Sequence, residues 1–160
     1  MKFMKKIAVK LFLVLAFVTV FSLYANAQTI SVSGSIEKNS VKRGKIGKGL
    51  IILSIPKELH INSNKPTSEF MIPTEVKLSS KEVKNIKTLY PKGKNLKFDF
   101  SEEAINVYEG KTIIPFTFAI PKLTKSKNIN IRALVSYQAC TNEDCYPPQK
   151  TEIILKRLVK

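Results

Sequence analysis

Cys140 and Cys145 are the chain's only cysteines, and they lie close enough in the sequence to react with each other. Four polar or turn-forming residues separate them, an alternating apolar segment leads in from Ile129, and another run leads out toward Leu155. This pattern predicts two strands that meet at a short reversal. Opposed residues of an antiparallel pair have Cα atoms about 4.5–5.5 Å apart, within the window of roughly 4.4–6.8 Å that a disulfide needs. The two thiols can therefore form a disulfide.

Such a pair serves either redox exchange or structural cross-linking, and exported proteins often carry the second kind. Three features argue against a simple cross-link. The closed ring is short, so the chain-entropy model gives about 2.2 kcal/mol for about six residues against about 4.7 kcal/mol for a hundred-residue loop. The cross-link of a two-sheet sandwich joins strands that are distant in sequence. The turn is also polar, so we expect it to be open to thiolate attack. From the residues alone, both functions stay open.

Other chemistries have less support. Two cysteines and the single, distant His60 provide too few ligands for a metal site. A catalytic thiol with His60 as its base stays open, although the second cysteine would then be unexplained. The hydrolase motifs Gly-x-Ser-x-Gly and His-Glu-x-x-His do not occur. Glu143 and Asp144 would disfavour a nearby thiolate, which predicts a slow resting thiol until a partner displaces or neutralises these acids.

The first 27 residues read as a secretory signal peptide: early lysines, a short apolar run and Ala25-Asn26-Ala27 as the cleavage site. We expect one mature domain over residues 28–160, periplasmic or otherwise secreted, without a membrane span. It would carry 23 Lys and Arg against 12 Asp and Glu, a net charge of +11. Scattered lysines and the absence of Trp favour a solvated surface over nucleic-acid binding. An acidic docking face on a partner is a further expectation.

The rest of the chain predicts an all-β fold, because apolar residues recur at every second position in several short segments. These segments are centred on residues 30–36, 50–53, 76–78, 98–100, 114–120 and 129–137. Turn-forming residues separate them, and crossover helices are lacking, which is typical of a β-sandwich. Residues 61–73 are expected to be irregular. We therefore predict a single β-sandwich domain.

The segment Tyr-Gln-Ala-Cys-Thr-Asn-Glu-Asp-Cys-Tyr-Pro-Pro at 137–148 resembles the signature of one family, the N-terminal periplasmic domains of the thiol:disulfide interchange protein DsbD. That family has a Tyr-Gln-x-Cys…Cys-x-Pro-Pro core. Weaker similarities occur at residues 59–64, 90–93 and 107–110, so the resemblance extends over nearly all of the chain that follows the signal peptide. It implies an immunoglobulin-like β-sandwich, which agrees with the strand pattern.

The resemblance also implies a mechanism of stepwise thiolate exchange that needs no metal or organic cofactor. The domain would take electrons from a thioredoxin-like domain and pass them to other periplasmic proteins. Cys145 would form the mixed disulfide with a partner, and Cys140 would then attack Cys145 and release that partner. In the family an aromatic cap loop shields the cysteines. The residues implied to surround the pair are His60, Asn62, Phe98, Asp99, Phe100, Tyr137, Glu143, Asp144 and Tyr146. Which of Phe98 and Phe100 is the cap, if either, stays open. His60 is equally well explained as an ordinary surface or turn residue.

Two departures from the family limit what it implies. Full-length members continue into a membrane domain and a thioredoxin-like domain, whereas this sequence ends at Lys160. We therefore expect electrons to come from thioredoxin-like periplasmic proteins or from a separate DsbD-type membrane electron carrier. The Cys-x4-Cys spacing is also slightly tighter than in the best-known members, which puts the disulfide geometry in question. The alternative function is an immunoglobulin-like binding or adaptor module whose disulfide only stiffens a hairpin.

Overall fold

The computed structural model describes residues 29–38, 41–68 and 70–159, and the predicted signal peptide lies outside them. The described residues form strands and no α-helix, so the predicted all-β fold is confirmed. None of their segments is a helix able to cross a membrane. The strands are β1 (Ser31–Ile36), β2 (Ile46–Ser54), β3 (His60–Asn62), β4 (Glu75–Ser79), β5 (Lys84–Thr88), β6 (Lys94–Leu96), β7 (Ile105–Tyr108), β8 (Lys111–Ala119), β9 (Asn128–Tyr137), β10 (Ala139–Cys140) and β11 (Gln149–Leu158).

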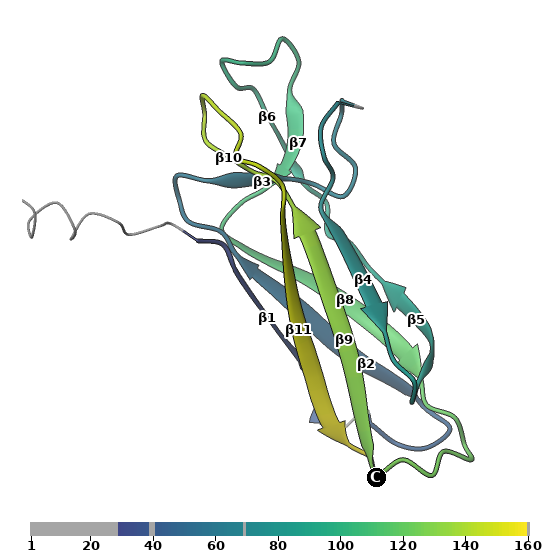
Figure 1. Ribbon diagram of the computed structural model, residues 1–160. Helices are drawn as coiled ribbons and strands as arrows, with labels where there is room; N and C mark the ends of the chain where they lie inside the picture. Colours follow the sequence, from purple (N-terminus) through teal and green to yellow (C-terminus); the bar gives the residue numbers. More distant parts are fainter. Residues whose placement is uncertain (1–28, 39–40, 69, 160) are drawn as a thin grey trace, which may run out of the picture.

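Two long sheets pack face to face, and a third, shorter sheet lies at one end of them (Figure 1). The first long sheet has the order β1-β2-β8-β5, and the second has the order β11-β9-β4. The end sheet has the order β10-β3-β7-β6. Every strand pair within these sheets is antiparallel. The molecule is thus a sandwich with a small sheet carried at one tip.

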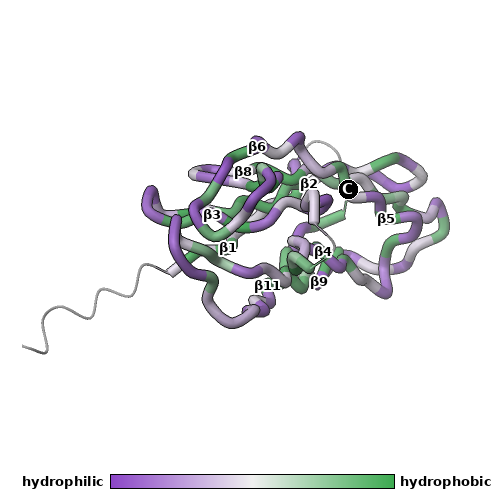
Figure 2. The backbone as a smooth tube through the Cα atoms, turned by 90° about the horizontal axis from the view of Figure 1, so that it is seen from above, coloured by the Kyte–Doolittle hydropathy of each residue, from purple (hydrophilic) through white to green (hydrophobic). Residues whose placement is uncertain are grey.

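The core lies between the two long sheets and follows from the period-2 pattern of the sequence. In β2, β8 and β9 every second residue is buried, because alternate side chains of a strand point to opposite faces. Seen from above, the two long sheets form separate layers, and hydrophobic and hydrophilic positions alternate along their strands (Figure 2). The buried core includes Ile51, Leu53, Ile114, Phe116, Phe118, Ile129, Ile131, Ala133 and Val135.

Some elements were not predicted. Strands β5 and β6 have one apolar residue each, Ile86 and Leu96, so they lack an alternating pattern and form only through pairing with β8 and β7. The alternation of Phe98 and Phe100 is not a strand, because these residues lie in the connection between β6 and β7. Residues 61–73 are irregular as expected, apart from the end of β3.

Two glycines of β2 make room for aromatic rings of β8. Gly47 pairs with Phe118 and Gly49 with Phe116. A Cβ atom at Gly49 would lie 2.2 Å from the Phe116 ring, and one at Gly47 would lie 2.3 Å from the Phe118 ring. The rings therefore cover the bare backbone of the neighbouring strand, and no larger residue fits beneath them.

We expect Gly49→Ala to lower the free energy of unfolding by about 1–3 kcal/mol, because the added methyl group displaces a fully buried ring. The control is Gly110→Asn. Gly110 has a positive φ of 57° and nothing within 4 Å of an added Cβ, and Asn tolerates that conformation, so this change should cost less than about 1 kcal/mol. Urea denaturation of both variants measures the difference. An equal loss in the two would contradict the packing argument.

Candidate functional site

The disulfide joins the two sides of a narrow hairpin at the tip of the molecule. Cys140 ends β10, and Cys145 faces it as an antiparallel bridge. The Ala139 carbonyl accepts the Tyr146 N–H at 2.8 Å, and the Thr141 N–H donates to the Asp144 carbonyl at 2.8 Å. The bonds therefore flank the cysteines, which form a non-hydrogen-bonded pair, the closer of the two antiparallel types. Their Cα atoms are 4.0 Å apart, less than the sequence predicted.

The two cysteines differ in exposure. Cys140 is 0% exposed, since it lies between the bridge to Cys145 and its pairing with β3. Cys145 belongs to an exposed stretch that runs from residue 142 to 150, and the neighbouring Tyr146 is 50% exposed. Attack on a disulfide requires an approach to one sulfur. An external thiolate therefore has access to the Cys145 side of this bond.

The hairpin turn is organised by the Thr141 side chain. Its hydroxyl accepts the backbone N–H groups of Glu143 at 3.2 Å and of Asp144 at 3.0 Å. Both acidic residues are exposed. The turn thus keeps the Glu143 and Asp144 side chains exposed to solvent near Cys145. The backbone hydrogen bonds of the hairpin are formed between its own residues.

His60 stands opposite Cys140 in the register of β3 and β10. Directly opposed residues of an antiparallel pair project from the same face, with Cβ atoms about 4.5–5.5 Å apart. The imidazole is 3% exposed, and its buried Nε2 atom has no hydrogen-bond partner. Burial lowers the His60 pKa below its ordinary value of 6.5, while the Glu109 carboxylate acts in the opposite direction. A neutral imidazole therefore lies beside the inner cysteine.

An aromatic stack covers His60. The Phe98 ring lies parallel to the imidazole, with centroids 4.0 Å apart, and the Phe100 ring continues the stack at 5.4 Å from Phe98. Phe98 is 6% exposed and packs with Ile105 and Val107, whereas Phe100 is 38% exposed. Asp99 between them is exposed. Of the two candidates for the cap, Phe98 is the one in contact with the site.

The Tyr108 hydroxyl brings three separate sequence motifs together. It lies 2.6 Å from Asn64 Oδ1 and 3.0 Å from the Pro91 carbonyl oxygen. The segments 59–64, 90–93 and 107–110 therefore meet at one buried tyrosine, whose pKa is raised by burial. This contact fixes β3 and β7 relative to each other, and β3 carries His60.

Asn62 and Tyr137 support the neighbouring backbone. The Asn62 side chain donates to the Ile72 carbonyl at 3.0 Å, and the Asn62 backbone carbonyl accepts from the Thr74 hydroxyl at 2.6 Å. The buried Tyr137 donates its hydroxyl to Gln149 Oε1 at 3.2 Å. Tyr137 is close to Cys140 in the sequence, and Asn62 belongs to β3, which pairs with β10. The hydrogen bonds of both residues are with surrounding segments and not with the cysteines.

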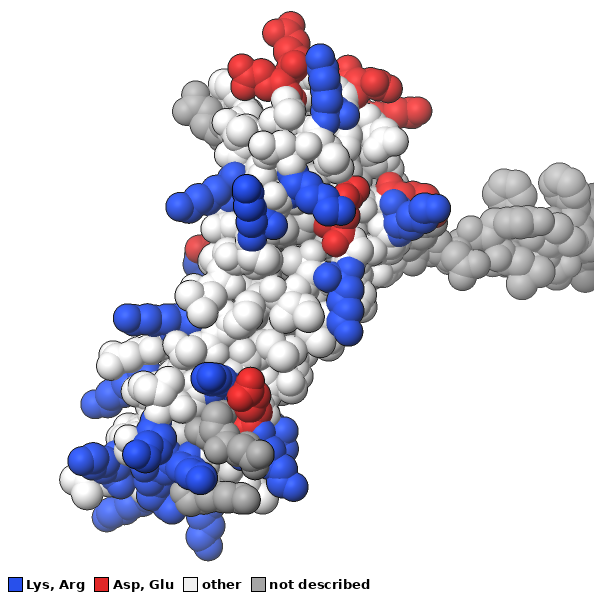
Figure 3. Space-filling view, turned by 180° about the vertical axis from the view of Figure 1, so that it is seen from behind, with Lys and Arg blue, Asp and Glu red and all other residues white. Residues whose placement is uncertain are grey.

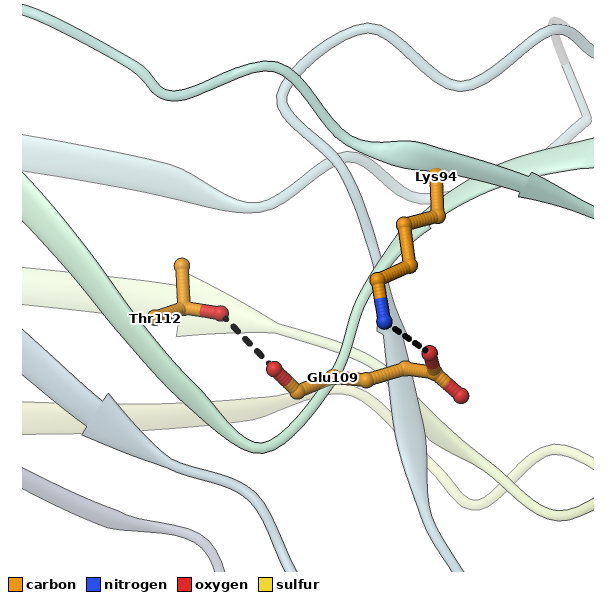
Figure 4. Close-up of polar contacts among 3 residues, drawn as sticks. All are labelled: Lys94, Glu109 and Thr112. Atoms are coloured by element: carbon orange, nitrogen blue, oxygen red, sulfur yellow. Dashed lines mark hydrogen bonds and ion pairs between the residues drawn. The ribbon is translucent and has the colours of Figure 1, made fainter.

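Glu109 and Lys94 are site residues that sequence reasoning did not single out. They form an ion pair at 3.2 Å, and the Thr112 hydroxyl donates to the Glu109 carbonyl at 3.3 Å across the β7–β8 turn (Figure 4). Glu109 belongs to the 107–110 motif, so its place in the resemblance was the available signal. An open pocket of about 410 Å³ connects it with the site; its lining is Lys57, Glu58, Leu59, His60, Glu109, Thr141, Asn142 and Glu143. The described residues hold no cluster of three or more potential metal ligands.

Charge is distributed unevenly along the molecule. Acidic side chains gather at the tip that carries the end sheet, and Lys and Arg dominate the opposite tip (Figure 3). The connections of the end sheet contain the exposed acids Asp99, Glu102, Glu103, Glu143 and Asp144. The same tip also carries exposed lysines, among them Lys57, Lys94 and Lys97, so the surface around the disulfide has both charges and is not uniformly basic.

Comparisons with known proteins bear on the family and the fold. The family model of the N-terminal domain of the thiol:disulfide interchange protein DsbD matches residues 36–157. Similar solved structures include the reduced N-terminal domain of Neisseria meningitidis DsbD, at 14% identity and a TM-score of 0.49, covering 83% of this chain and 91% of that one. The N-terminal periplasmic domain of Proteus mirabilis ScsB has 12% identity and a TM-score of 0.52, covering 79% of this chain.

This chain spans 44% of the ScsB structure. At such identity the likeness supports the fold, which is an immunoglobulin-like β-sandwich as expected. A search of curated proteins found no match. The family model and the Cys140–Cys145 disulfide together support a thiol–disulfide exchange domain.

The lowered pKa of His60 predicts a loss of stability in mild acid. Between the folded and unfolded pKa values the unfolded chain binds the extra proton, so stability is complete above about pH 6.5 and falls as the pH drops below it. We expect the urea midpoint of the oxidised protein to fall between pH 7.5 and pH 5, and to fall less in His60→Gln. The pKa of Glu82 is lowered from 4.5, so Glu82 changes the stability only below pH 5 and does not affect this comparison. Parallel curves for the two proteins would contradict the assignment.

Proposed function

The chain belongs to the family of DsbD N-terminal domains, and from this we propose that it is an exported thiol–disulfide exchange domain. It relays electrons between a thioredoxin-like donor and disulfide-containing proteins of the periplasm. The observation that carries this proposal is the unequal exposure of the bonded pair, with Cys140 buried and Cys145 exposed. A two-step exchange needs one sulfur that meets partners and one that resolves the adduct.

The exchange proceeds by two attacks on sulfur. In the reduced domain the Cys145 thiolate attacks a partner disulfide, forms a mixed disulfide, and releases the partner's first sulfur as a thiolate. Cys140 then attacks the Cys145 sulfur, which restores the internal disulfide and releases the second partner thiolate. The partner gains two electrons and this domain loses two. The reverse sequence with a donor dithiol reduces the domain again.

The charge around the disulfide bears on the choice of partner. The exposed acids Glu143 and Asp144 lie in the hairpin turn beside Cys145, so a partner with cations beside its reactive cysteine would associate faster and in a fixed orientation. This replaces the expectation of an acidic docking face, which rested on the net charge alone. Thioredoxin-like proteins, or a separate DsbD-type membrane carrier, are the partners that the family leads us to propose.

The first test is the reduction potential of the pair together with a trap for the adduct. We expect the purified protein to have a potential of about −120 to −270 mV, the range of catalytic dithiols. Cys140→Ser should accumulate a mixed disulfide through Cys145 when mixed with an oxidised thioredoxin-like protein. Cys145→Ser is the matched control and should accumulate much less, because its remaining thiol is buried. Glutathione titration and mass spectrometry provide the two readouts.

The alternative, an adaptor module with a structural disulfide, makes the opposite prediction. Its potential would lie below about −300 mV, and neither variant would form an adduct. Replacing both cysteines by Ser would then change stability alone. That result would overturn the proposed exchange function.

We further propose that Phe98 shields the disulfide by holding the 97–104 connection over His60. Phe98→Ala removes a stacking contact worth about 0.5–1.5 kcal/mol, so the open population and the rate of reduction by dithiothreitol should rise roughly 2- to 10-fold. The measurement is the pseudo-first-order rate of disulfide loss. Phe100→Ala is the matched control, and its effect should be smaller because Phe100 contacts the stack from outside. Equal rates in Phe98→Ala and the unmodified protein would refute the shielding role.

A further inference from the structure

We propose that His60 is the general base that takes the proton from the Cys140 thiol when Cys140 resolves the mixed disulfide. This inference rests on the proposed exchange function and assigns the proton transfer within it. Cys140 must react as a thiolate, yet it is 0% exposed. Burial in apolar surroundings raises the pKa of a thiol, so at neutral pH solvent alone would produce little of the thiolate. A base supplied by the protein is therefore needed.

His60 is placed to be that base. It is the direct cross-strand neighbour of Cys140, and opposed side chains share one face of the sheet. The Tyr108 contact, which ties β7 to the segment after β3, holds this register. Glu109 directly follows β7, the strand that pairs with β3 on the side away from β10, and it forms an ion pair with Lys94 of β6. His60 therefore lies on the strand between the disulfide hairpin and the strand that leads to Glu109.

The bonding state of Nε2 fits the role. In neutral imidazole one nitrogen donates and the other accepts, and Nε2 is buried without a partner in the oxidised protein. Disulfide sulfurs carry no hydrogen, so an acceptor beside them has nothing to bond. Reduction places an S–H group on Cys140, the nearest residue across the strand pair. With the imidazole proton on Nδ1, Nε2 is an acceptor whose donor appears when the disulfide opens.

The surroundings of His60 stabilise the imidazolium that results. The Glu109 carboxylate favours the charged form, while the Phe98 ring stacked at 4.0 Å keeps the imidazole covered in the resting protein. The 410 Å³ pocket, with His60 in its lining, gives the proton a route to water. Lys57 and Glu58, which precede β3, Glu109 from the β7–β8 turn and Glu143 from the hairpin line this pocket. Lys94 of β6 pairs with Glu109, and Asp99 follows Phe98.

The step balances in protons and electrons. His60 Nε2 takes the proton of the Cys140 thiol, and the sulfur's electron pair attacks Cys145 Sγ. The Cys140–Cys145 bond forms, the bond from Cys145 to the partner sulfur breaks, and its electron pair leaves on the partner thiolate. The imidazolium then gives its proton to that thiolate or, through the pocket, to water.

The test is the oxidation of the reduced protein by 5,5′-dithiobis(2-nitrobenzoate). Attack by Cys145 releases the first thionitrobenzoate, and resolution by Cys140 releases the second, so the second phase isolates the proposed step. In His60→Gln, which keeps a polar side chain without a base, we expect this phase to slow about 100-fold at pH 7. The first phase should change little. Toward pH 10 the two proteins should converge, because hydroxide then deprotonates Cys140.

A second variant keeps the proposal testable if His60→Gln folds poorly. Glu109→Gln changes a partly exposed residue and removes the carboxylate that favours the imidazolium, so the pH midpoint of the second phase should move to lower pH. Phe100→Leu serves as the control that changes the outer ring of the stack and leaves His60 and Phe98 in place, and it should retain a fast second phase at pH 7.

The outcomes separate this inference from the function on which it rests. An unchanged second phase in His60→Gln, or one slowed equally at all pH values, would overturn the role of His60 as a base and leave exchange intact. A missing second phase in the unmodified protein at every pH would overturn both. An unmoved midpoint in Glu109→Gln would also count against the base.

Discussion

The three-residue strand β3 is the constraint on which the site depends. It pairs with β10 on one side and β7 on the other, so all three of its residues are buried. This pairing sets His60 opposite Cys140. A slip of one residue would turn His60 to the other face of the sheet. The hydrogen bonds of Asn62 and Tyr108 to neighbouring loops resist such a slip, which gives these residues a role in the site without contact to sulfur.

The sandwich below the end sheet does not need the disulfide to hold its core. The large buried cluster lies mainly between the two long sheets, extends into the end sheet through Ile61, Tyr108 and Ala139, and does not include the cysteines. The end sheet adds a smaller cluster of Phe98, Ile105 and Val107 under the 97–104 connection. The disulfide can therefore open while the main core stays packed. That separation suits a bond that forms and breaks, whereas a cross-link that stabilised the fold would join the long sheets.

The long strands and the cysteine hairpin could be predicted because the residues that determine them are close together in the sequence. Alternating residues such as Phe116 and Phe118 in β8 reveal a buried face, and four turn-forming residues between two cysteines reveal a hairpin. The short strands β5 and β6 could not be predicted, since their one apolar residue each carries no period and pairing alone makes them strands. The contacts of His60 with Phe98 and of Tyr108 with Asn64 join residues 38 and 44 positions apart, which no local pattern encodes.

Shielding and reactivity are coupled through the burial of His60. While Phe98 covers the imidazole, burial keeps its pKa low, so it is neutral and a weak base. If a docking partner moves Phe98 aside, that contribution shrinks while Glu109 continues to favour the charged form, and the His60 pKa rises. A higher pKa makes the imidazole a stronger base at the moment when Cys140 must lose its proton. The same stack that protects the resting disulfide would then delay deprotonation until a partner is present.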